Sequence, residues 1–328
     1  MYVVTGGAGF IGSNLLATLE AHGIAPLACV DRCDDPHKVR NIAKRKLAHV
    51  VAPEQTFAFL DANAADVKAI FHLGAITSTT ERDLAKLDEV NVRLSRALWV
   101  WCTRQSVPFI YASSAATYGD GTEGFNDNAT VEALARLKPL NPYGQSKHTF
   151  DLFIAQETAQ ARAAPPSWAG LKFFNVYGAN EFHKGSQASL VPQIYPKAIT
   201  GEPYPLFKSH NPAYADGGQL RDFIFVEDCC DVMLWLLETR KVHGLFNLGT
   251  GKARSFLDLA SAVYKAAGRE SSITYRDTPA DIRAQYQYFT QAKMERLRAA
   301  GYTRPFTSLE DGVTATVQRY LSKSDPYR

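Results

Sequence analysis

Short apolar runs alternate with longer amphipathic segments through the first half of the chain. The runs are apolar at nearly every position, as expected of strands covered on both faces of a sheet. Four of them are residues 2–5, 27–31, 69–73 and 109–113. Helix-length segments, such as 12–22 and 84–105, lie between them. This alternation predicts an α/β fold with right-handed crossovers and a doubly wound parallel sheet.

The second half of the chain is less regular. Further strands are predicted at 171–176 and 223–226, at wider spacing than in the first half. The segment 200–219 is rich in proline and glycine, so we expect an irregular stretch that covers a substrate. The polar residues 322–328 are predicted to fray.

Charge and cysteine content narrow the classes of partner. The chain has 36 Lys and Arg against 33 Asp and Glu, a net charge of +3. This small excess, with no concentrated basic face, argues against nucleic-acid or membrane binding. The N-terminus has no signal-peptide pattern, and no window reaches the apolar length of a membrane-spanning helix. The five cysteines form no CxxC pair or metal-ligand cluster, so we expect reduced thiols, no metal and a cytoplasmic location.

A glycine-rich turn follows the first predicted strand and opens the first predicted helix. Gly6, Gly9 and Gly12 give the spacing GxxGxxG, and Asp31 ends the next strand. Glycines let the backbone bend and a pyrophosphate approach, while the helix N-terminus presents unpaired N–H groups to an anion. A plain tight turn would also contain glycines, but this position and the following acidic residue favour a dinucleotide site. The sequence therefore predicts a Rossmann domain.

The residues after the second strand bear on the choice of nicotinamide. Asp31 can accept hydrogen bonds from the adenosine ribose, which favours NAD. Arg32 follows at once, and Lys38 and Arg40 lie in the next loop, where cations can hold a 2′-phosphate. Surface charge is the commoner role of such residues. On this chemistry we favour NADP over NAD.

A second pattern predicts the reacting groups. Tyr143 and Lys147 are four residues apart, so on a helix they share one face. A nearby ammonium favours the phenolate and is expected to lower the pKa of the tyrosine toward that of a useful base. Ser114 ends a predicted strand upstream, where its hydroxyl can hold a substrate oxygen. A glycine turn, a strand-end serine and YxxxK in this order are the arrangement of short-chain dehydrogenases.

The chain continues far beyond Lys147, which is similar to the extended branch of that superfamily. The segment 247–251, Asn-Leu-Gly-Thr-Gly, supports the same assignment. The resemblance implies a nucleotide-sugar substrate, gripped by a smaller C-terminal α/β domain. Arg221, which opens an Arg-Asp-Phe segment, matches a phosphate-contacting position of that branch. We expect a Rossmann domain from 1–172 with about 222–244, and a substrate-binding domain from about 173–221 with 245–328.

Several longer segments resemble one family within that branch, the ADP-L-glycero-D-manno-heptose 6-epimerases of lipopolysaccharide-core biosynthesis. These segments are 111–119, 174–178, 183–186, 286–292 and 297–302. The His-Lys-Gly-Ser and Tyr-Gln-Tyr-Phe-Thr-Gln-Ala segments are the most specific of them. The resemblance covers nearly the whole chain. It implies an isomerase that inverts carbon 6 of an ADP-bound heptose with tightly held NADP.

The resemblance also implies roles for individual residues. A hydride leaves C6 to give a transient ketone and returns to the opposite face, with Tyr143 and Lys184 as paired acid/base groups. Lys147 is expected to anchor the nicotinamide ribose, and Ser114 to hydrogen-bond the reacting oxygen. The expected cofactor contacts are Gly6, Gly9, Phe10, Ile11, Gly12, Asp31, Arg32, Lys38, Leu73, Gly74, Ala75, Asn91, Tyr143, Lys147, Val176 and Lys184. The expected substrate contacts are Ser114, Asn175, Ser186, Gln193, Phe207, Arg221 and Tyr286.

Two other functions use the same features. A UDP-hexose 4-epimerase or a dehydratase would share the cofactor turn and the Tyr143–Lys147 pair, but would not need Lys184. A non-catalytic dinucleotide sensor on the same fold would be expected to have lost the tyrosine or the lysine. From the residues alone, Lys184 reads as a surface lysine in a loop. The resemblance also implies a homo-oligomer, while the segment 208–220 is longer than the family pattern leads us to expect.

Overall fold

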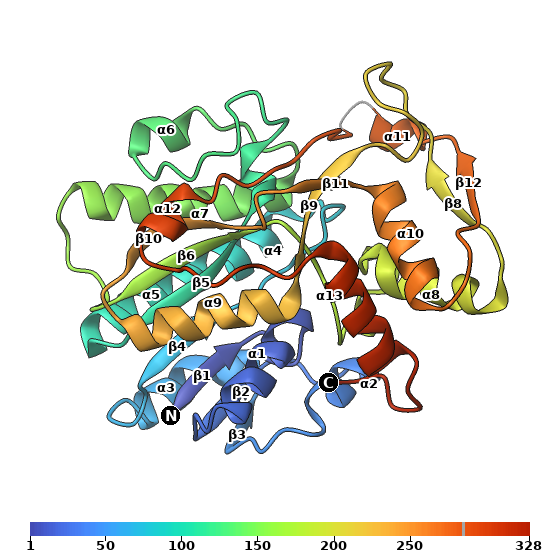
Figure 1. Cartoon of the computed structure of the whole chain (residues 1–328). Helices are drawn as coiled ribbons and strands as arrows, with labels where there is room; N and C mark the ends of the chain where they lie inside the picture. Colours follow the sequence, from blue (N-terminus) through green and yellow to red (C-terminus); the bar gives the residue numbers. More distant parts are fainter. Residues whose placement is uncertain (284–285) are drawn as a thin grey trace.

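The computed structural model describes residues 1–283 and 286–328. Its larger layer is a seven-stranded sheet in the order β10-β6-β5-β4-β1-β2-β3, and every strand pair in it is parallel (Figure 1). The strands are β1 (Tyr2–Thr5), β2 (Leu27–Val30), β3 (His49–Val51), β4 (Ala69–His72), β5 (Phe109–Ser114), β6 (Trp168–Phe173) and β10 (His243–Leu248). The predicted doubly wound parallel α/β fold is confirmed.

Helices cover both faces of this sheet because successive strand residues point to opposite sides. In β1, Val4 packs into a core with α1 and α9, whereas Val3 packs into a second core with α5 and α7. The first core is bounded by α1 (Phe10–Ala21), α2 (Pro36–Ile42) and α9 (Val226–Thr239). The second is bounded by α3 (Thr56–Ala62), α5 (Leu94–Gln105), α6 (Val131–Ala135) and α7 (Pro142–Ala159).

A smaller lobe is built from two short sheets, ordered β11-β9-β7 and β12-β8. The strands are β7 (Asn175–Tyr177), β8 (Tyr204–Phe207), β9 (Leu220–Phe225), β11 (Ala253–Ser255) and β12 (Ile273–Arg276). The helices after β6, apart from α9, are α8 (Leu190–Thr200), α10 (Phe256–Ala266), α11 (Ala280–Arg283), α12 (Glu295–Ala299) and α13 (Leu309–Thr316). A third core joins α8, α10 and α13 to these strands. The segment predicted to be irregular thus contains β8.

Three other predicted elements differ from the structure. The strand expected at 171–176 is two strands, β6 and β7, and they pair in different sheets. The strand expected at 223–226 is β9, which ends at Phe225 because Val226 opens α9. The helix expected at 84–105 is divided into α4 (Leu84–Leu87), a π-helical turn η2 (Asp88–Arg93) and α5.

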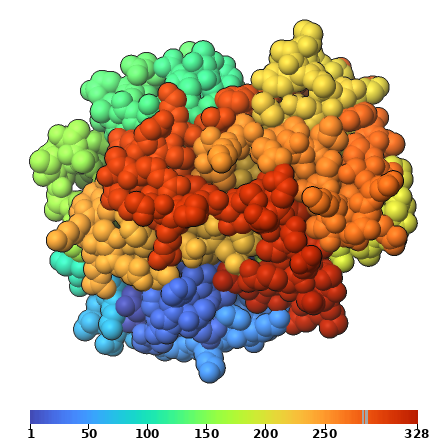
Figure 2. All heavy atoms as spheres, in the orientation of Figure 1, coloured from blue at the N-terminus to red at the C-terminus, as the bar shows by residue number. Residues whose placement is uncertain are grey.

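The C-terminal residues do not fray as predicted. Tyr327 is 3% exposed, and its hydroxyl lies 2.6 Å from Nδ1 of His37 on α2. The backbone N–H of Arg328 donates to Oδ1 of Asn180, and its guanidinium donates to the backbone oxygen of Asn14 on α1. Figure 2 shows this segment, in red, lying against the N-terminal region, in blue. The prediction failed because a polar terminus was judged without the partners that the fold supplies.

Among the residues that the structure describes, no helix combines the length and apolar character needed to cross a membrane.

Candidate active site

The glycine turn between β1 and α1 is packed too tightly for a side chain. Gly6 has a φ of +67°, and a Cβ added there would lie 2.6 Å from the backbone nitrogen of Gly74. A Cβ on Gly12 would lie 2.1 Å from the carbonyl oxygen of Gly6. Gly9 caps α1 and has no side chain to satisfy the first turn, which leaves backbone N–H groups of Phe10 and Ile11 for an anion. The turn therefore fits the pyrophosphate of a dinucleotide.

Asp31, at the carboxyl end of β2, joins this turn to α2. Its Oδ2 accepts from the backbone N–H of Ala8 at 3.0 Å, and its Oδ1 accepts from Nζ of Lys38 at 2.9 Å. The exposed side chain of Arg32 donates to the carboxylate of Glu54. Asp31, expected to contact the adenosine ribose, is thus paired with Lys38, which is expected to contact a 2′-phosphate.

The end of β4 forms the next wall of the site. Leu73 and Gly74 donate their backbone N–H groups to Thr5, at 3.1 Å to its carbonyl and 3.2 Å to its hydroxyl, and Ala75 follows, partly buried. Asn91, on η2, is 1% exposed. Its side chain binds both backbone groups of the residue after Ala75 and donates to the hydroxyl of Ser146, which in turn donates to the carbonyl of Tyr143. Asn91 therefore ties the β4 loop to α7.

Tyr143 and Lys147 lie in the first turns of α7, as their spacing predicts. The helix starts at Asn141, whose side chain accepts from the N–H of Gly144 at 2.8 Å. Lys147 is 5% exposed, and its Nζ donates to the carbonyl of Ala112 in β5 at 3.0 Å. β5 ends at Ser114, whose hydroxyl lies close enough to Tyr143 to act on its pKa. The structure thus brings the predicted serine, tyrosine and lysine together.

Burial dominates the ionisation of these two groups. It lowers the pKa of Lys147 to about 8, against an opposing effect of the Asp151 carboxylate. It raises the pKa of Tyr143, although the nearby Ser114 hydroxyl works in the other direction. The sequence predicted a lowered pKa for Tyr143, so that direction was wrong. Removal of the phenol from water is the largest cause, and the nearby carboxylate of Asp151 raises the pKa further.

Lys184 lies beside the glycine turn, on a different element from Tyr143. It lies in the short helical turn η4 (Phe182–Gln187), and its Nζ is 5.1 Å from the centroid of the Phe10 ring. The turn is anchored by Glu181, which is 1% exposed. Its carboxylate accepts from the N–H groups of Gly178 and Ser189 and from the Ser189 hydroxyl. Burial raises the pKa of this glutamic acid. An amine that looked like a surface group is therefore held at the start of α1.

The remaining residues expected at the substrate divide into two groups. Asn175 and Val176 lie on β7, directly after the large sheet, and Ser186 is exposed on η4. Gln193 lies on α8 and donates to the backbone oxygen of Ala188 at 2.7 Å. These residues lie on β7, η4 and α8. Their expected contacts with a ligand stay predictions.

Arg221, Phe207 and Tyr286 form a second group in the smaller lobe. The guanidinium of Arg221 is 5.5 Å from the centroid of the Tyr286 ring, and the Tyr286 and Phe207 rings meet edge to face at 6.3 Å. Arg221 is 8% exposed and donates to the backbone oxygens of Leu220 and Gln287. Burial lowers its pKa. A buried cation at this position fits the predicted phosphate contact.

The long segment 208–220 packs against this second group. The Tyr214 and Tyr288 rings are 5.3 Å apart, and the N–H of His210 donates to the Tyr288 hydroxyl at 3.0 Å. The N–H of Ser209 donates to Oδ1 of Asp216 at 2.7 Å, which closes the segment on itself. The segment therefore borders the group formed by Arg221, Phe207 and Tyr286.

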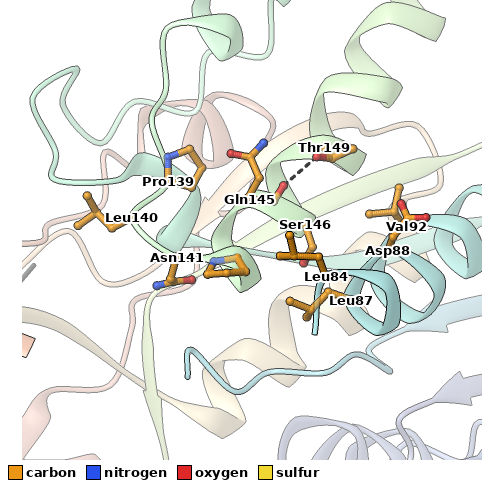
Figure 3. A pocket seen from close by; sticks show the side chains of 11 residues that line it. Leu84, Leu87, Asp88, Val92, Pro139, Leu140, Asn141, Gln145, Ser146 and Thr149 are labelled. Atoms are coloured by element: carbon orange, nitrogen blue, oxygen red, sulfur yellow. Dashed lines mark hydrogen bonds between the residues drawn. The ribbon is translucent and has the colours of Figure 1, made fainter. Parts of the chain in front are cut away.

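A separate pocket of about 390 Å³ lies between α4 and η2 on one side and the start of α7 on the other (Figure 3). Leu84, Leu87, Pro139 and Gln145 are among its lining residues. None of the predicted site residues, all of which lie in the described part of the chain, lines it. We therefore do not assign the nucleotide sugar to this pocket.

Comparison with known proteins identifies the family to which this chain belongs. A model of the NAD dependent epimerase/dehydratase family matches residues 2–249. A curated protein of Nitratidesulfovibrio vulgaris, named ADP-L-glycero-D-manno-heptose-6-epimerase, is 47% identical over 330 residues, with 100% of each chain covered. The chain belongs to the NAD-dependent epimerase/dehydratase family.

Solved structures agree with membership of this epimerase/dehydratase family. The Helicobacter pylori ADP-L-glycero-D-manno-heptose-6-epimerase is 28% identical, with a TM-score of 0.77 and coverage of 95% of this chain and 93% of that chain. A UDP-N-acetylglucosamine 4-epimerase from Methanobrevibacter ruminantium M1 has a TM-score of 0.80 at 21% identity, covering 98% of each chain. The second likeness shows the fold alone.

Sequence reasoning missed two supports of this epimerase/dehydratase site. One is Glu181, which holds the turn that carries Lys184. The other is the buried pair of Asp151 and Lys172 behind α7, at 2.8 Å. A signal existed for Asp151, because it stands one further helical turn beyond Tyr143 and Lys147. No periodic signal marks Glu181.

Proposed function

We propose that this protein is an ADP-glyceromanno-heptose 6-epimerase, an isomerase that converts the D-glycero to the L-glycero epimer. The observation that carries the proposal is the position of Lys184 at the ring of Phe10, at the start of α1. Phe10 belongs to the glycine turn, so Lys184 borders the expected cofactor site and can supply a second proton-handling group besides Tyr143. The full-length likeness to the enzyme named for this reaction supports the substrate.

The chain's own groups handle the protons and hold the reacting oxygen. Tyr143 and Lys184 belong to different elements. One can take the proton of the C6 hydroxyl as the ketone forms, and the other can return a proton to that oxygen after the keto intermediate has rotated in the site. Ser114 donates to the same oxygen and stabilises its developing charge. A bound nicotinamide supplies the hydride acceptor and donor.

We propose NADP as the cofactor, with NAD as the alternative. Lys38 forms an ion pair with Asp31. The paired carboxylate is a weaker hydrogen-bond acceptor for the ribose hydroxyl of NAD. It also repels the 2′-phosphate of NADP less strongly than a free carboxylate would. The side chain of Arg32 is exposed beside it. Mass analysis of the nucleotide released from denatured protein tests this choice. Recovery of NAD alone would overturn it and leave the reaction standing.

The reaction is tested by proton NMR of purified protein with ADP-D-glycero-D-manno-heptose and no added cofactor. We expect the L-glycero epimer to accumulate, because the nicotinamide stays bound. No conversion, even after NADP⁺ and then NAD⁺ are added, would overturn the heptose substrate and direct the search to UDP- and dTDP-hexoses. That result would favour the rival 4-epimerase or dehydratase, or in the extreme a non-catalytic sensor.

We also propose the division into two lobes, with its boundaries adjusted to the strand pairing. β10 pairs with β6 as far as Leu248, whereas β9 pairs with β7 and β11. The Rossmann domain is then 1–173 with 226–248, and the substrate lobe takes the rest. A homo-oligomer, a cytoplasmic location and a role in lipopolysaccharide-core synthesis complete the proposal, which sedimentation analysis and cell fractionation test.

A further inference from the structure

A buried ion pair lies directly behind the proposed reacting groups. Asp151 stands on α7, four residues after Lys147, and is 1% exposed. Its Oδ2 accepts from Nζ of Lys172 on β6 at 2.8 Å and from the hydroxyl of Ser113 at 2.6 Å. Its Oδ1 accepts from the hydroxyl of Tyr111 at 3.0 Å. Both charged side chains of the pair are 0% exposed.

The cation of the pair is equally well fixed. Nζ of Lys172 also donates to the hydroxyl of Thr117 at 2.6 Å and lies 4.9 Å from the centroid of the Tyr118 ring. Stability alone is a weak reason for such a pair, because apolar residues of similar volume often replace a buried pair without loss. The placement of the pair calls for a further reason.

That reason lies in the strand that faces α7. In β5, the side chains of Tyr111 and Ser113 bind Asp151, while the carbonyl of Ala112 between them accepts from Lys147. The anion and the buried ammonium are therefore held by three consecutive residues of one strand. Ser114, which follows, lies close enough to Tyr143 to lower its pKa.

We propose that Asp151, fixed by Lys172, is a positioning residue that keeps the buried ammonium of Lys147 charged beside Tyr143. An opposite charge nearby favours the ionised form of a group that burial would otherwise neutralise. The directions of the ionisation shifts agree: burial lowers the pKa of Lys147 to about 8, and Asp151 raises it. The proposed epimerase function is needed only for the kinetic readout below.

Other ionisable groups packed around the pair do not explain a titration near that pH. His148 lies beside the pair on α7, and His72 at the end of β4 lies near Lys147; burial lowers the pKa of both, and the charge of Lys147 lowers that of His72 further. Burial raises the pKa of Tyr111 and of Tyr118 well above the ordinary value. Asp127, before α6, has a raised pKa through burial, and Arg296 of α12 lies 3.9 Å from its carboxylate.

The test is a pH titration of the holoprotein labelled with ¹³C at the lysine ε-carbon. The signal of Lys147 is assigned by its loss in Lys147→Arg. In Asp151→Asn we expect the midpoint of Lys147 to move about one pH unit lower. Glu157→Gln removes a carboxylate from the same helix, where it pairs with Arg162 at 2.8 Å, and should leave the midpoint unchanged.

Asp151→Asn leaves Lys172 without its anion, so the variant can fail to fold. The double variant Asp151→Asn/Lys172→Gln removes both charges and leaves no unpaired buried ion, so it allows the titration to be measured if the single variant does not fold. Its midpoint is expected to fall less than in Asp151→Asn, because a like charge is removed with the anion, but still below the wild type, because Asp151 is the charge that acts on Lys147. A wild-type midpoint in either folded variant would overturn the proposal and leave Asp151 a structural role only.

The second readout is the pH dependence of kcat. If Asp151 acts through Lys147, the alkaline limb of the profile moves to lower pH together with the NMR midpoint. A uniform fall of kcat at every pH would contradict the proposal. Failure of the wild type to epimerise the heptose would overturn the proposed reaction, while the substrate-free titration would still decide the role of Asp151.

Discussion

The two proposed acid/base groups rest on supports of very different construction. Tyr143 belongs to α7, a helix of 18 residues that is capped by Asn141 and packed on the large sheet. Lys184 belongs to η4, a turn of 6 residues in which Gly185 has a φ of +53°. The turn is fixed from outside, by the carboxylate of Glu181. One group is placed by regular structure and the other by a single buried side chain.

This difference shows how a site on two lobes can combine a fixed group with an adjustable one. The fold continues to hold Tyr143 if any one surface contact is lost, since many buried contacts secure α7. The position of Lys184 depends on a few hydrogen bonds. Substitution of either reacting group should therefore lower turnover by a similar factor. Substitution of a supporting residue should lower turnover more at Lys184 than at Tyr143.

The largest effect is expected from removing either reacting group. Tyr143→Phe and Lys184→Met should each lower epimerase turnover by about 10³-fold, because each removes one of two proton transfers. Turnover is measured by NMR, and the amount of co-purified nicotinamide checks that the fold is intact. Lys86→Met, at an exposed lysine of α4 paired with Glu81, is the matched control. Near-normal turnover in Lys184→Met would favour the reading as a 4-epimerase.

A smaller effect is expected from the support of Lys184. In Glu181→Gln, an amide NH₂ group replaces a carboxylate oxygen that accepts from the backbone N–H of Ser189. Two donors then face each other, so η4 should shift. We expect turnover to fall by about 10²-fold through misplacement of Lys184. Hydrogen exchange should rise in 181–189 and stay unchanged in α7. Faster exchange in α7 as well would mean that the two supports are not independent.

The pH dependence should separate the activity of the fixed region from its stability. Lys147 has a pKa lowered to about 8 from 10.5, so its charge and the activity should be lost as the pH rises through about 8. Between these two values the unfolded chain binds the extra proton, so the contribution of Lys147 to the free energy of unfolding rises with pH. Rate profiles and thermal unfolding at each pH check these opposite signs. Parallel declines would contradict the assignment to Lys147.

The smallest effect is expected at Gly185. A Cβ added there meets no atom within 4 Å, so Gly185→Ala changes only the backbone preference. At a positive φ this costs about 1 kcal/mol, which we expect to appear as a few-fold loss of turnover. Gly23→Ala, also at a positive φ with open space around it, is the control far along the chain. A loss as large as that of Lys184→Met would show that activity requires η4 to stay almost entirely in its native backbone conformation.

The parts of the site that were predictable from the sequence are those with local periodicity. The strand runs, the glycine turn and the four-residue spacing of Tyr143 and Lys147 all follow from regular structure. Lys184 has no such pattern, because its position depends on Glu181 and on a contact with Phe10 far away in the chain. Only the family resemblance indicated it.

Burial was the physical quantity that the sequence concealed. Asp151 follows Lys147 at a spacing common on exposed helices, and its burial depends on Lys172 from a later strand. The predicted direction of the Tyr143 pKa shift was wrong for the same reason, since desolvation of the buried phenol is the largest cause and raises the pKa. The C-terminal residues were expected to fray because their partners, such as His37, lie at the other end of the chain.

The late entry of β10 into the large sheet limits how this protein can exchange parts with its relatives. The chain leaves the sheet after β6, builds β7 to β9, returns through α9 and β10, and then leaves again. No single contiguous block carries the smaller lobe. A recombination event that imports a new sugar-binding surface must therefore use two separate segments, or else bring a foreign edge strand into the sheet. Such a protein is expected to change specificity by point substitution more readily than by modular exchange.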